Sequence, residues 1–517
     1  MRDVNRNLFL LIPLSAFLLL SPLARADDDA INNDDIPPPS EGEGAVIKVF
    51  PSRKLGSVKP MNAVNNGPNF VYDGSGWHDG RFDEYRALEI PMARTHDSRY
   101  MEGPGTRLND LALIFPNFEA DENDPKNYDF DLTDLNLQTI RLAGAEIMYF
   151  LGSSCDSLFK CYGTDEPPKD PAKWARIAAN IVRHYNEGWG WSNEKIAFSN
   201  QFNVVYWELW NEPDLDVTKE YWEKGTRTWE RRHRYWNGSP EQFFEFYTIA
   251  SKQLKATFPN LKFGGPGLAG HVDWAERFLA HCAKSRAPID FFSWHAYPSE
   301  LKRIVSRAKA GRELLDKYGY AKAESIVGEW NWNAGWYGDA FRLSIARRGE
   351  MNNYRIAAFY AAMMCAMQHA PVDMLMYYDM RVPCQYNGVF SNDAELTLKG
   401  YYAFYAWSRL RRLGREVASS VAGDFADDIR AVAAEGRDGR LAVCVTRYTR
   451  DANAMTSVPV RLAVNGRRLD AARMHLTDEL ERYTEKVLRV RPDGTADFRL
   501  APNAFAVIEL EPGASFR

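Results

Sequence analysis

Eight short apolar runs, separated by stretches with helix-start signals, constrain this chain more than any other feature of its sequence. Two of the separating stretches open with helix caps, one at Asp170-Pro171 and one at Ser239-Pro240 with Gln242 in the capping-box position. The runs lie at residues 57–64, 88–95, 146–152, 204–210, 261–267, 290–297, 325–331 and 373–379. Eight strand–helix alternations predict an α/β fold, namely a (β/α)8 TIM barrel over residues 56–415.

The pattern changes after the barrel. Residues 416–517 contain short alternating segments such as "RLAVCVTRY" and "AFAVIEL", punctuated by Gly, Asp and Asn. This spacing is typical of a β-sandwich domain. An early strand-like segment at residues 45–55 precedes the barrel and is predicted to join the same sandwich.

The N-terminus has the features of a secretory signal peptide. Arg2 and Arg6 precede a short apolar run, and Ala24 and Ala26 form a cleavage motif, so residues 1–26 are predicted to be removed. The alternative is a membrane anchor, for which this run is short. Residues 27–44 are acidic and Pro-rich and are predicted to form a flexible linker. The expected location is secreted or periplasmic, with no membrane span after signal cleavage.

Composition excludes several kinds of partner. The chain of 517 residues carries a net charge of -5, which gives no basic surface for nucleic acid. No CxxC or HExxH spacing occurs, so neither a metal nor a cofactor is predicted. Of the six cysteines only Cys155 and Cys161 lie close in sequence, and either a disulfide or two free thiols fits this spacing.

Two glutamates follow barrel strands at the point where active sites lie in such folds. Glu212 ends the fourth predicted strand in "VVYWELWNEP", and Glu329 ends the seventh in "IVGEW". A carboxylate pair is what glycoside hydrolysis requires, because one group must donate a proton while the other is ionised. A retaining enzyme places the two groups about 5 to 5.5 Å apart, and an inverting enzyme about 6.5 to 9.5 Å.

Other polar side chains lie at neighbouring strand ends. His295 and Tyr297 follow the sixth strand in "SWHAYP", from which either could hydrogen-bond to a catalytic carboxylate. Arg94 and His96 lie at the end of the second strand, in "RTHD". Arg94 is expected inside the barrel as an orienting group that neutralises a carboxylate such as Glu208, which we interpret as structural because it lies within its strand.

Aromatic residues gather after the fourth and seventh strands. Trp336 and Tyr337 are the favoured candidates for stacking against a sugar ring, since flat apolar rings cover the C–H faces of a pyranose. The basic run "ERRHRYW" at residues 230–236 has two interpretations. It either binds an acidic sugar such as a uronic acid or forms a solvated loop, and the loop is favoured.

The motifs "WNEP", "HAYP", "GEW" and "RTHD" resemble those of glycoside hydrolase family 39, which includes β-xylosidases and α-L-iduronidases. The resemblance implies Glu212 as acid/base and Glu329 as nucleophile. It further implies that Asn211, His295, Tyr297 and His96 bind or orient the sugar. The eighth strand departs from the pattern, because Tyr377 and Tyr378 stand about where the xylosidases are expected to have a Trp.

These features together predict a secreted retaining glycoside hydrolase, β-xylosidase-like, that acts on plant or microbial oligosaccharides or polysaccharides. An exo-glycosidase for another sugar, of uronic acid, arabinose or galactose type, is the first alternative. A carbohydrate-binding protein that has lost its chemistry, and a metal-dependent hydrolase, are alternatives of other classes. The sequence leaves the sugar, the anomer, exo or endo action and the oligomeric state open.

Overall fold

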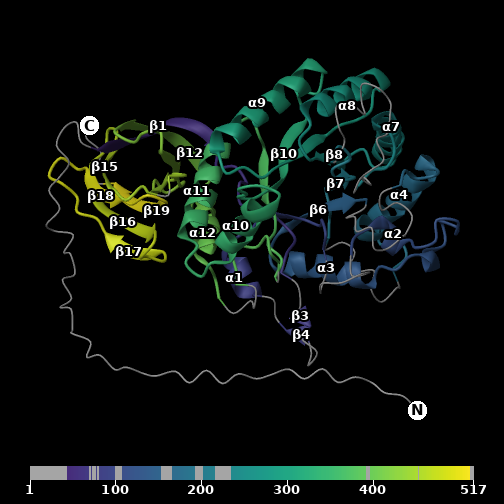
Figure 1. The fold of residues 1–517 in the computed structure, drawn as a ribbon, viewed down its shortest axis with the longest axis horizontal. Helices are drawn as coiled ribbons and strands as arrows, with labels where there is room; N and C mark the ends of the chain where they lie inside the picture. Colours follow the sequence, from purple (N-terminus) through teal and green to yellow (C-terminus); the bar gives the residue numbers. More distant parts are fainter. Residues whose placement is uncertain are drawn as a thin grey trace, which may run out of the picture. The chain divides into compact units, whose positions relative to one another are not determined.

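Eight parallel strands close into a barrel, in the cyclic order β2, β5, β6, β7, β8, β9, β10 and β11, in a computed structural model of the chain (Figure 1). Each of the eight predicted runs overlaps one of these strands, so the predicted barrel is confirmed. The strands are β2 (Ala63–Asn65), β5 (Met92–Arg94), β6 (Glu146–Leu151), β7 (Tyr206–Leu209), β8 (Lys262–Leu268), β9 (Phe291–Ala296), β10 (Glu324–Trp330) and β11 (Met374–Tyr377).

The structure describes only part of the chain, and all of that part lies within the unit Pro39–Arg517. The predicted signal peptide and the Cys155–Cys161 pair fall outside it. The described residues are 44–68, 71–72, 77–78, 81–98, 108–152, 166–191, 202–215, 235–382, 384–391, 396–451 and 453–512.

Helices α4 (Pro171–Glu187) and α7 (Pro240–Thr257) begin where their capping residues predict. Asp170 accepts a hydrogen bond from the Lys173 amide at the start of α4, and Ser239 and Gln242 form a reciprocal capping box at the start of α7. The helices are α1 (Phe82–Ala87), α2 (Leu111–Ile114), η2 (Pro125–Asn127), α3 (Asp131–Leu142), α4 (Pro171–Glu187), α7 (Pro240–Thr257), α8 (Val272–Ser285), α9 (Leu301–Lys317), α10 (Gly338–Gly349), α11 (Tyr354–Gln368) and α12 (Lys399–Leu413). Two short strands, β3 (Val71–Tyr72) and β4 (Trp77–His78), lie between β2 and β5 in the sequence and pair with each other.

The barrel interior changes from apolar to polar along the strands. An apolar cluster includes Met92, Phe291 and Ile326. Two residues further along their strands, Arg94 and Ser293 are fully buried polar side chains. Every second side chain of a strand faces the barrel interior. The interior side chains therefore form an apolar layer, then a polar layer two residues further along, and then the groups at the strand ends.

The C-terminal strands form one hydrogen-bonded sheet in the order β17, β16, β19, β14, β13, β12, β1, β15 and β18. The early strand β1 (Ala45–Ser57) lies within it, antiparallel to β12 and parallel to β15. The other strands are β12 (Arg415–Gly423), β13 (Ile429–Glu435), β14 (Leu441–Arg447), β15 (Val458–Val464), β16 (Leu469–Thr477), β17 (Thr484–Val487), β18 (Ala496–Leu500) and β19 (Ala504–Pro512). The fold class is thus a TIM barrel followed by a largely antiparallel C-terminal sheet.

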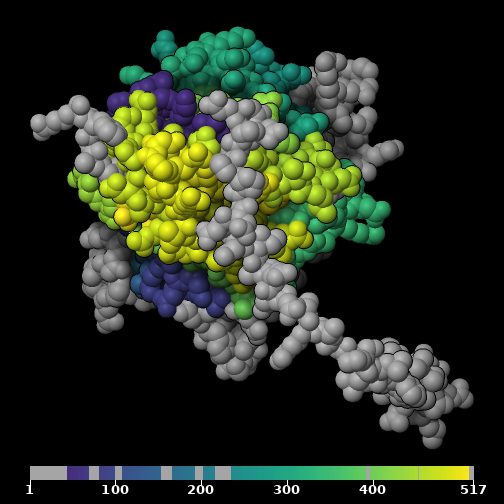
Figure 2. Space-filling model, turned by 90° about the vertical axis from the view of Figure 1, so that its left-hand side faces the viewer, coloured from purple at the N-terminus to yellow at the C-terminus, as the bar shows by residue number. Residues whose placement is uncertain are grey.

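Helices α11 and α12 lie between the barrel and the C-terminal sheet (Figure 1). Thr446 on β14 donates a hydrogen bond to the Ala358 carbonyl on α11, and Trp332, just beyond β10, donates to the Tyr448 hydroxyl. In the space-filling view the yellow and yellow-green C-terminal strands gather on one face of the molecule (Figure 2). The sheet therefore packs against the helical outer layer of the barrel.

Among the described residues, no helix is both long and apolar enough to cross a membrane. Cys282, Cys365, Cys384 and Cys444 are buried free thiols in the same part of the chain.

Candidate active site

A β-bulge turns Glu329 toward the centre of the barrel. In the pairing of β10 with β9, Val327 lies opposite Trp294 and Glu329 opposite His295, so Gly328 is the extra residue. A bulge shifts the alternation of side chains by one position and re-aims those beyond it. Glycine suits this position, because a Cβ on Gly328 would lie 3.3 Å from His295 Nε2. Without the bulge, Glu329 would point to the opposite side of β10 from Ile326. With it, both side chains face the barrel interior.

Glu212 is presented by a loop that leaves β7 in an unusual conformation. Trp210 and Glu212 both have positive φ angles, 71° and 44°. The Glu212 amide donates a hydrogen bond to the Gly267 carbonyl at the end of β8, at 3.0 Å. The loop is therefore attached to the neighbouring strand at the acidic residue itself.

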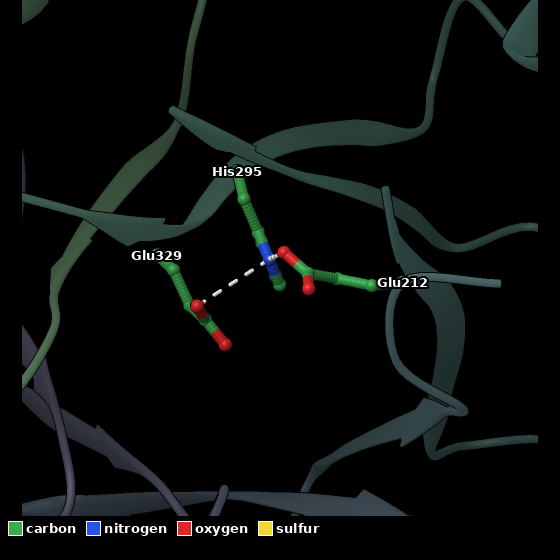
Figure 3. A group of neighbouring side chains, drawn as sticks. All are labelled: Glu212, His295 and Glu329. Atoms are coloured by element: carbon green, nitrogen blue, oxygen red, sulfur yellow. Dashed lines mark hydrogen bonds and ion pairs between the residues drawn. The ribbon is translucent and has the colours of Figure 1, made fainter. Parts of the chain in front are cut away.

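Glu212, His295 and Glu329 converge from three strand ends (Figure 3). His295 Nδ1 lies 2.8 Å from Glu212 Oε1 and 3.5 Å from Glu329 Oε2. One ligand-type atom from each of the three residues lies within 4.8 Å of the others. The two predicted catalytic carboxylates thus lie in one cluster, with an imidazole between them.

Glu329 is buried and held by three further side chains. Arg94 Nη1 donates to its Oε1 at 2.8 Å, Tyr297 donates its hydroxyl to Oε2 at 2.6 Å, and His96 Nε2 lies 3.4 Å from Oε1. Burial raises the pKa of Glu329, and the Arg94 charge and the Tyr297 hydrogen bond act in the opposite direction. Its orientation and ionisation are therefore set by residues from two other strand ends, those of β5 and β9.

Arg94 is the hub of the buried polar layer. It donates to Glu208 Oε2 at 2.5 Å, to Asn65 Oδ1 at 2.9 Å and to Asn211 Oδ1 at 2.7 Å, in addition to Glu329. Burial lowers the pKa of Arg94, but the carboxylates of Glu208 and Glu329 more than offset this, so the guanidinium stays charged. Glu208 also accepts the Ser293 hydroxyl at 2.6 Å. The expected pairing of Arg94 with Glu208 is present, and both residues are fully buried.

Two buried polar atoms beside the carboxylates have no hydrogen-bond partner within the described part of the chain. They are Nε2 of His295 and Nδ2 of Asn211. Burial lowers the pKa of His295 to about 4, so the ring is neutral at neutral pH and can both donate and accept. Unsatisfied buried groups carry a free-energy penalty of about 1 to 3 kcal/mol, which a hydroxyl-rich ligand would relieve.

The two aromatic residues predicted as platforms are exposed. Trp336 is 49 % and Tyr337 80 % exposed. Trp336 packs edge-on against Tyr297, with ring centroids 4.9 Å apart, which connects it to the nucleophile candidate. Sequence reasoning missed Tyr386, whose ring lies 6.3 Å from that of Tyr297. The basic residues 231, 232 and 234 fall outside the described part of the chain, so their role stays a prediction.

The two tyrosines at the end of the eighth strand have different environments. Tyr377 is buried, and its hydroxyl is 2.9 Å from that of Tyr360. Tyr378 lies beside the site, with ring centroids 6.1 Å from His96 and 6.4 Å from Tyr297. Of the two tyrosines, Tyr378 is therefore the one that lies beside the candidate site.

A second buried charged group was not predicted. Arg381 lies 3.1 Å from Asp379 Oδ2 and 3.4 Å from Asp97 Oδ2, and Tyr378 donates its hydroxyl to Asp97. Burial raises the pKa of Asp379, with Arg381 acting in the opposite direction. The signal in the sequence was an acidic residue directly after His96 in "THD", a predicted site residue, and after Tyr378 in "YYD", where the chain departs from the family pattern.

The three converging residues also resemble a metal-ligand set, because two carboxylates and an imidazole are common ligands. The surroundings oppose this interpretation. The Arg94 guanidinium already lies 2.8 Å from Glu329, so a metal ion would bring a second cation to the same carboxylate. The expectation of a metal-independent site stays a prediction that chelation tests.

Comparison with known proteins agrees with this geometry. Residues 130–374 match the model of glycosyl hydrolases family 39. A β-xylosidase of Geobacillus stearothermophilus is 28% identical over 211 residues, which are 39% of this chain and 37% of that protein. The chain thus matches little more than a third of that relative's length.

Solved structures show the same fold over nearly the whole chain. A glucosidase from Croceicoccus marinus aligns with a TM-score of 0.66 at 21% identity, covering 91% of this chain and 99% of that one. A monomeric β-xylosidase from Caulobacter crescentus CB15 aligns with a TM-score of 0.60 at 18% identity, covering 91% and 100%.

A TIM barrel with two glutamates at the ends of its fourth and seventh strands, followed by a β-sheet, defines the class as glycoside hydrolase. Within that class, residues 130–374 match the model of glycosyl hydrolases family 39, which supports assigning the chain to that family.

Proposed function

We propose that the chain is a retaining glycoside hydrolase that cleaves a β-xyloside or a related glycoside by double displacement. The observation that carries this proposal is the convergence of Glu212 and Glu329, whose nearest oxygens lie within 4.8 Å of each other. This spacing favours the retaining geometry, in which the carboxyl groups are about 5 to 5.5 Å apart, over the wider inverting one.

The surroundings of the two glutamates support different roles. Two neighbouring carboxyl groups repel when both are ionised, so a state with one proton between them is favoured. Glu329 makes an ion pair with Arg94 and accepts the Tyr297 hydroxyl, both of which stabilise its charged form. We therefore assign the negative charge to Glu329 and the proton to Glu212.

The proposed reaction follows from that assignment. Glu212 transfers its proton to the glycosidic oxygen while a Glu329 oxygen attacks the anomeric carbon, and the bond to the leaving group breaks. Glu212, now ionised, takes a proton from water, which attacks the same carbon and releases Glu329. Each displacement inverts the anomeric centre, so the product retains the configuration of the substrate.

Asn211 and His295 are proposed to bind the sugar directly. Each has a buried polar atom without a partner in the described residues. His295 contacts Glu212, and Asn211 accepts from Arg94, which also donates to Glu329. A hydroxyl that donates to or accepts from these atoms would satisfy them, as recognition of a polyhydroxylated ring requires. His96, Tyr297, Trp336 and Tyr337 are proposed to complete the substrate site.

The related proteins and the eighth barrel strand both bear on which sugar is bound. Xylose is favoured by the similarity to a β-xylosidase, whereas the structural neighbour from Croceicoccus marinus is a glucosidase. The tyrosines of the eighth strand, about where the xylosidases are expected to have a Trp, leave room for another sugar, of uronic acid, arabinose or galactose type. A panel of nitrophenyl glycosides tests the activity, and NMR of the first product anomer tests retention. Absence of turnover on every member would favour the alternative of a carbohydrate-binding protein without chemistry.

Export is proposed on the sequence alone. Residues 1–26 have the pattern of a cleaved signal peptide. N-terminal sequencing of the protein recovered from the periplasm or medium should begin at Asp27. Recovery of the intact chain in the cell membrane would support an anchor instead.

A further inference from the structure

Asp214, two residues after Glu212, is a fully buried carboxylate that reaches across to the loop between β8 and α8. Its Oδ1 accepts the Ala269 amide at 2.8 Å, and its Oδ2 accepts the amides of Gly270 and His271, each at 3.0 Å. Of these three residues, His271 is the N-cap of α8 and the other two precede it. Asp214 therefore supplies from another loop an acceptor for the segment that leads into α8.

The same loop carries Glu212 in a conformation that needs support. Positive φ angles at Trp210 and Glu212 cost about 1 kcal/mol or more each for residues with side chains. Such conformations persist only where the surroundings hold them. The Glu212 amide is held by the Gly267 carbonyl, and the Leu215 amide closes a turn onto the Glu212 carbonyl. Asp214 attaches the remaining part of this loop to the β8 side of the barrel.

The charge of Asp214 also has favourable neighbours. It accepts from three backbone N–H groups just before α8, and hydrogen bonds to a charged acceptor are stronger than neutral ones. The Arg307 guanidinium packs closely against Gly270, where an added Cβ would lie 2.8 Å from its terminal nitrogens. Burial lowers the pKa of Arg307, and Asp214 and Glu212 act against this effect. The Asp214 contacts are thus part of the same charged region as the acid/base candidate.

We propose that Asp214 is a positioning residue for Glu212. By attaching the Glu212 loop to residues 269–271, Asp214 fixes the position and orientation of the proton donor. The inference rests on the proposed function, because it assigns Asp214 a part in proton donation. Misplacement of a catalytic group by about 1 Å reduces its contribution about 100-fold. Loosening this attachment should therefore reduce the steps that need Glu212 and spare those that do not.

Asp214→Asn is the appropriate perturbation, since the side chain keeps its size and leaves no cavity. Its oxygen can still accept, but its NH2 group faces N–H donors instead of accepting from them. Asp290→Asn is a matched control. Asp290 accepts the Phe263 amide at 2.9 Å and pairs with Lys255, yet it precedes β9 at the opposite end of the barrel.

The measurement is kcat/KM for two glycosides of the same sugar, one with a dinitrophenolate leaving group and one with a simple alkoxide. An activated phenolate needs little protonation, whereas an alkoxide depends on the acid. Asp214→Asn should lower kcat/KM for the alkyl glycoside about 10- to 100-fold and leave the dinitrophenyl glycoside within about 3-fold. The ratio of the two values does not depend on how much of the variant is folded. Asp290→Asn should leave the ratio at its wild-type value.

Two results would overturn the inference. If Asp214→Asn lowers both substrates by the same factor, Asp214 serves stability alone. If Asp290→Asn changes the ratio as much as Asp214→Asn, the effect is not specific to the Glu212 loop. Failure of the wild-type protein to cleave either glycoside, with any sugar of the panel, would instead reject the proposed function.

Discussion

Tyr297→Phe should make the protein lose activity at low pH and keep it at higher pH. The Tyr297 hydroxyl donates to Glu329 Oε2 at 2.6 Å inside a buried site. A hydrogen bond to a charged group contributes about 1.5 to 3 kcal/mol, which corresponds to about a 10- to 150-fold change in an equilibrium. This bond favours the ionised form of Glu329, so its removal raises the pKa of that carboxyl further in the direction that burial already sets.

The expected result follows from the sign of this change. Below the acid limb of the kcat/KM profile, the fraction of enzyme with Glu329 ionised should fall about 10- to 150-fold in the variant. Well above the limb both enzymes carry an ionised Glu329, and their activities should converge. The assay is kcat/KM against pH for a dinitrophenyl glycoside, on which proton donation contributes little.

Tyr206→Phe is the matched control, because Tyr206 donates to Glu324 Oε2 at 2.9 Å at the other end of β10. Its pH profile should coincide with that of the wild type. An unchanged acid limb in Tyr297→Phe would refute the argument that this hydroxyl controls the ionisation of Glu329. A uniform loss of activity at every pH would do the same.

Three further outcomes test the account. Glu212→Gln should lower kcat/KM on natural glycosides by about 10²–10⁴-fold and lower it much less on activated aryl glycosides. Azide should restore the activity of Glu212→Gln but not that of Glu329→Gln. Equal rescue of both variants would reject the assigned roles. Chelators should leave kcat unchanged, because Arg94 already pairs with Glu329, and a loss restored by a divalent metal would show that Glu212, His295 and Glu329 hold an ion. If the basic residues 231, 232 and 234 bind an acidic sugar, salt should weaken activity on a glucuronide but not on a xyloside, and an equal response would exclude that role.

Much of the site follows from strand periodicity and could be predicted from the sequence. Strand β9 places Phe291 in the apolar layer and Ser293 in the polar layer, and the same period of two carries His295 to the site. The ion pair of Arg94 with Glu208 could be predicted because both residues stand within strands, and a buried carboxylate there needs a positive charge to neutralise it. The resemblance of short motifs to a family added the roles of the two glutamates.

What the sequence did not reveal depends on contacts between loops. Asp214 reads as an ordinary turn residue after "NEP", and its three partners lie more than fifty positions further along the chain. Arg381 follows the last barrel strand, β11, and Asp97 follows the second, β5, so the two residues meet only because β11 pairs with β2 to close the barrel. Such pairs form only after the barrel has closed, and neither local propensity nor hydrophobic period encodes them.

The C-terminal region shows the same limit. Alternating segments predicted its strands, and β1 was expected to join them. The period of two does not tell which strands are neighbours, so the position of β1 between β12 and β15, antiparallel to one and parallel to the other, was not predictable.

The central claim, that Glu329 forms a covalent bond to the sugar, is tested most directly by trapping that intermediate. A 2-deoxy-2-fluoro glycoside with a dinitrophenolate leaving group, built on a sugar that the protein cleaves, slows the second displacement and lets the glycosyl-enzyme accumulate. Mass spectrometry of the intact protein should show the added mass of one fluorosugar, and peptide mapping should place it on Glu329. A label on another carboxylate, or rapid turnover of the natural glycoside with inversion and no label, would contradict the account.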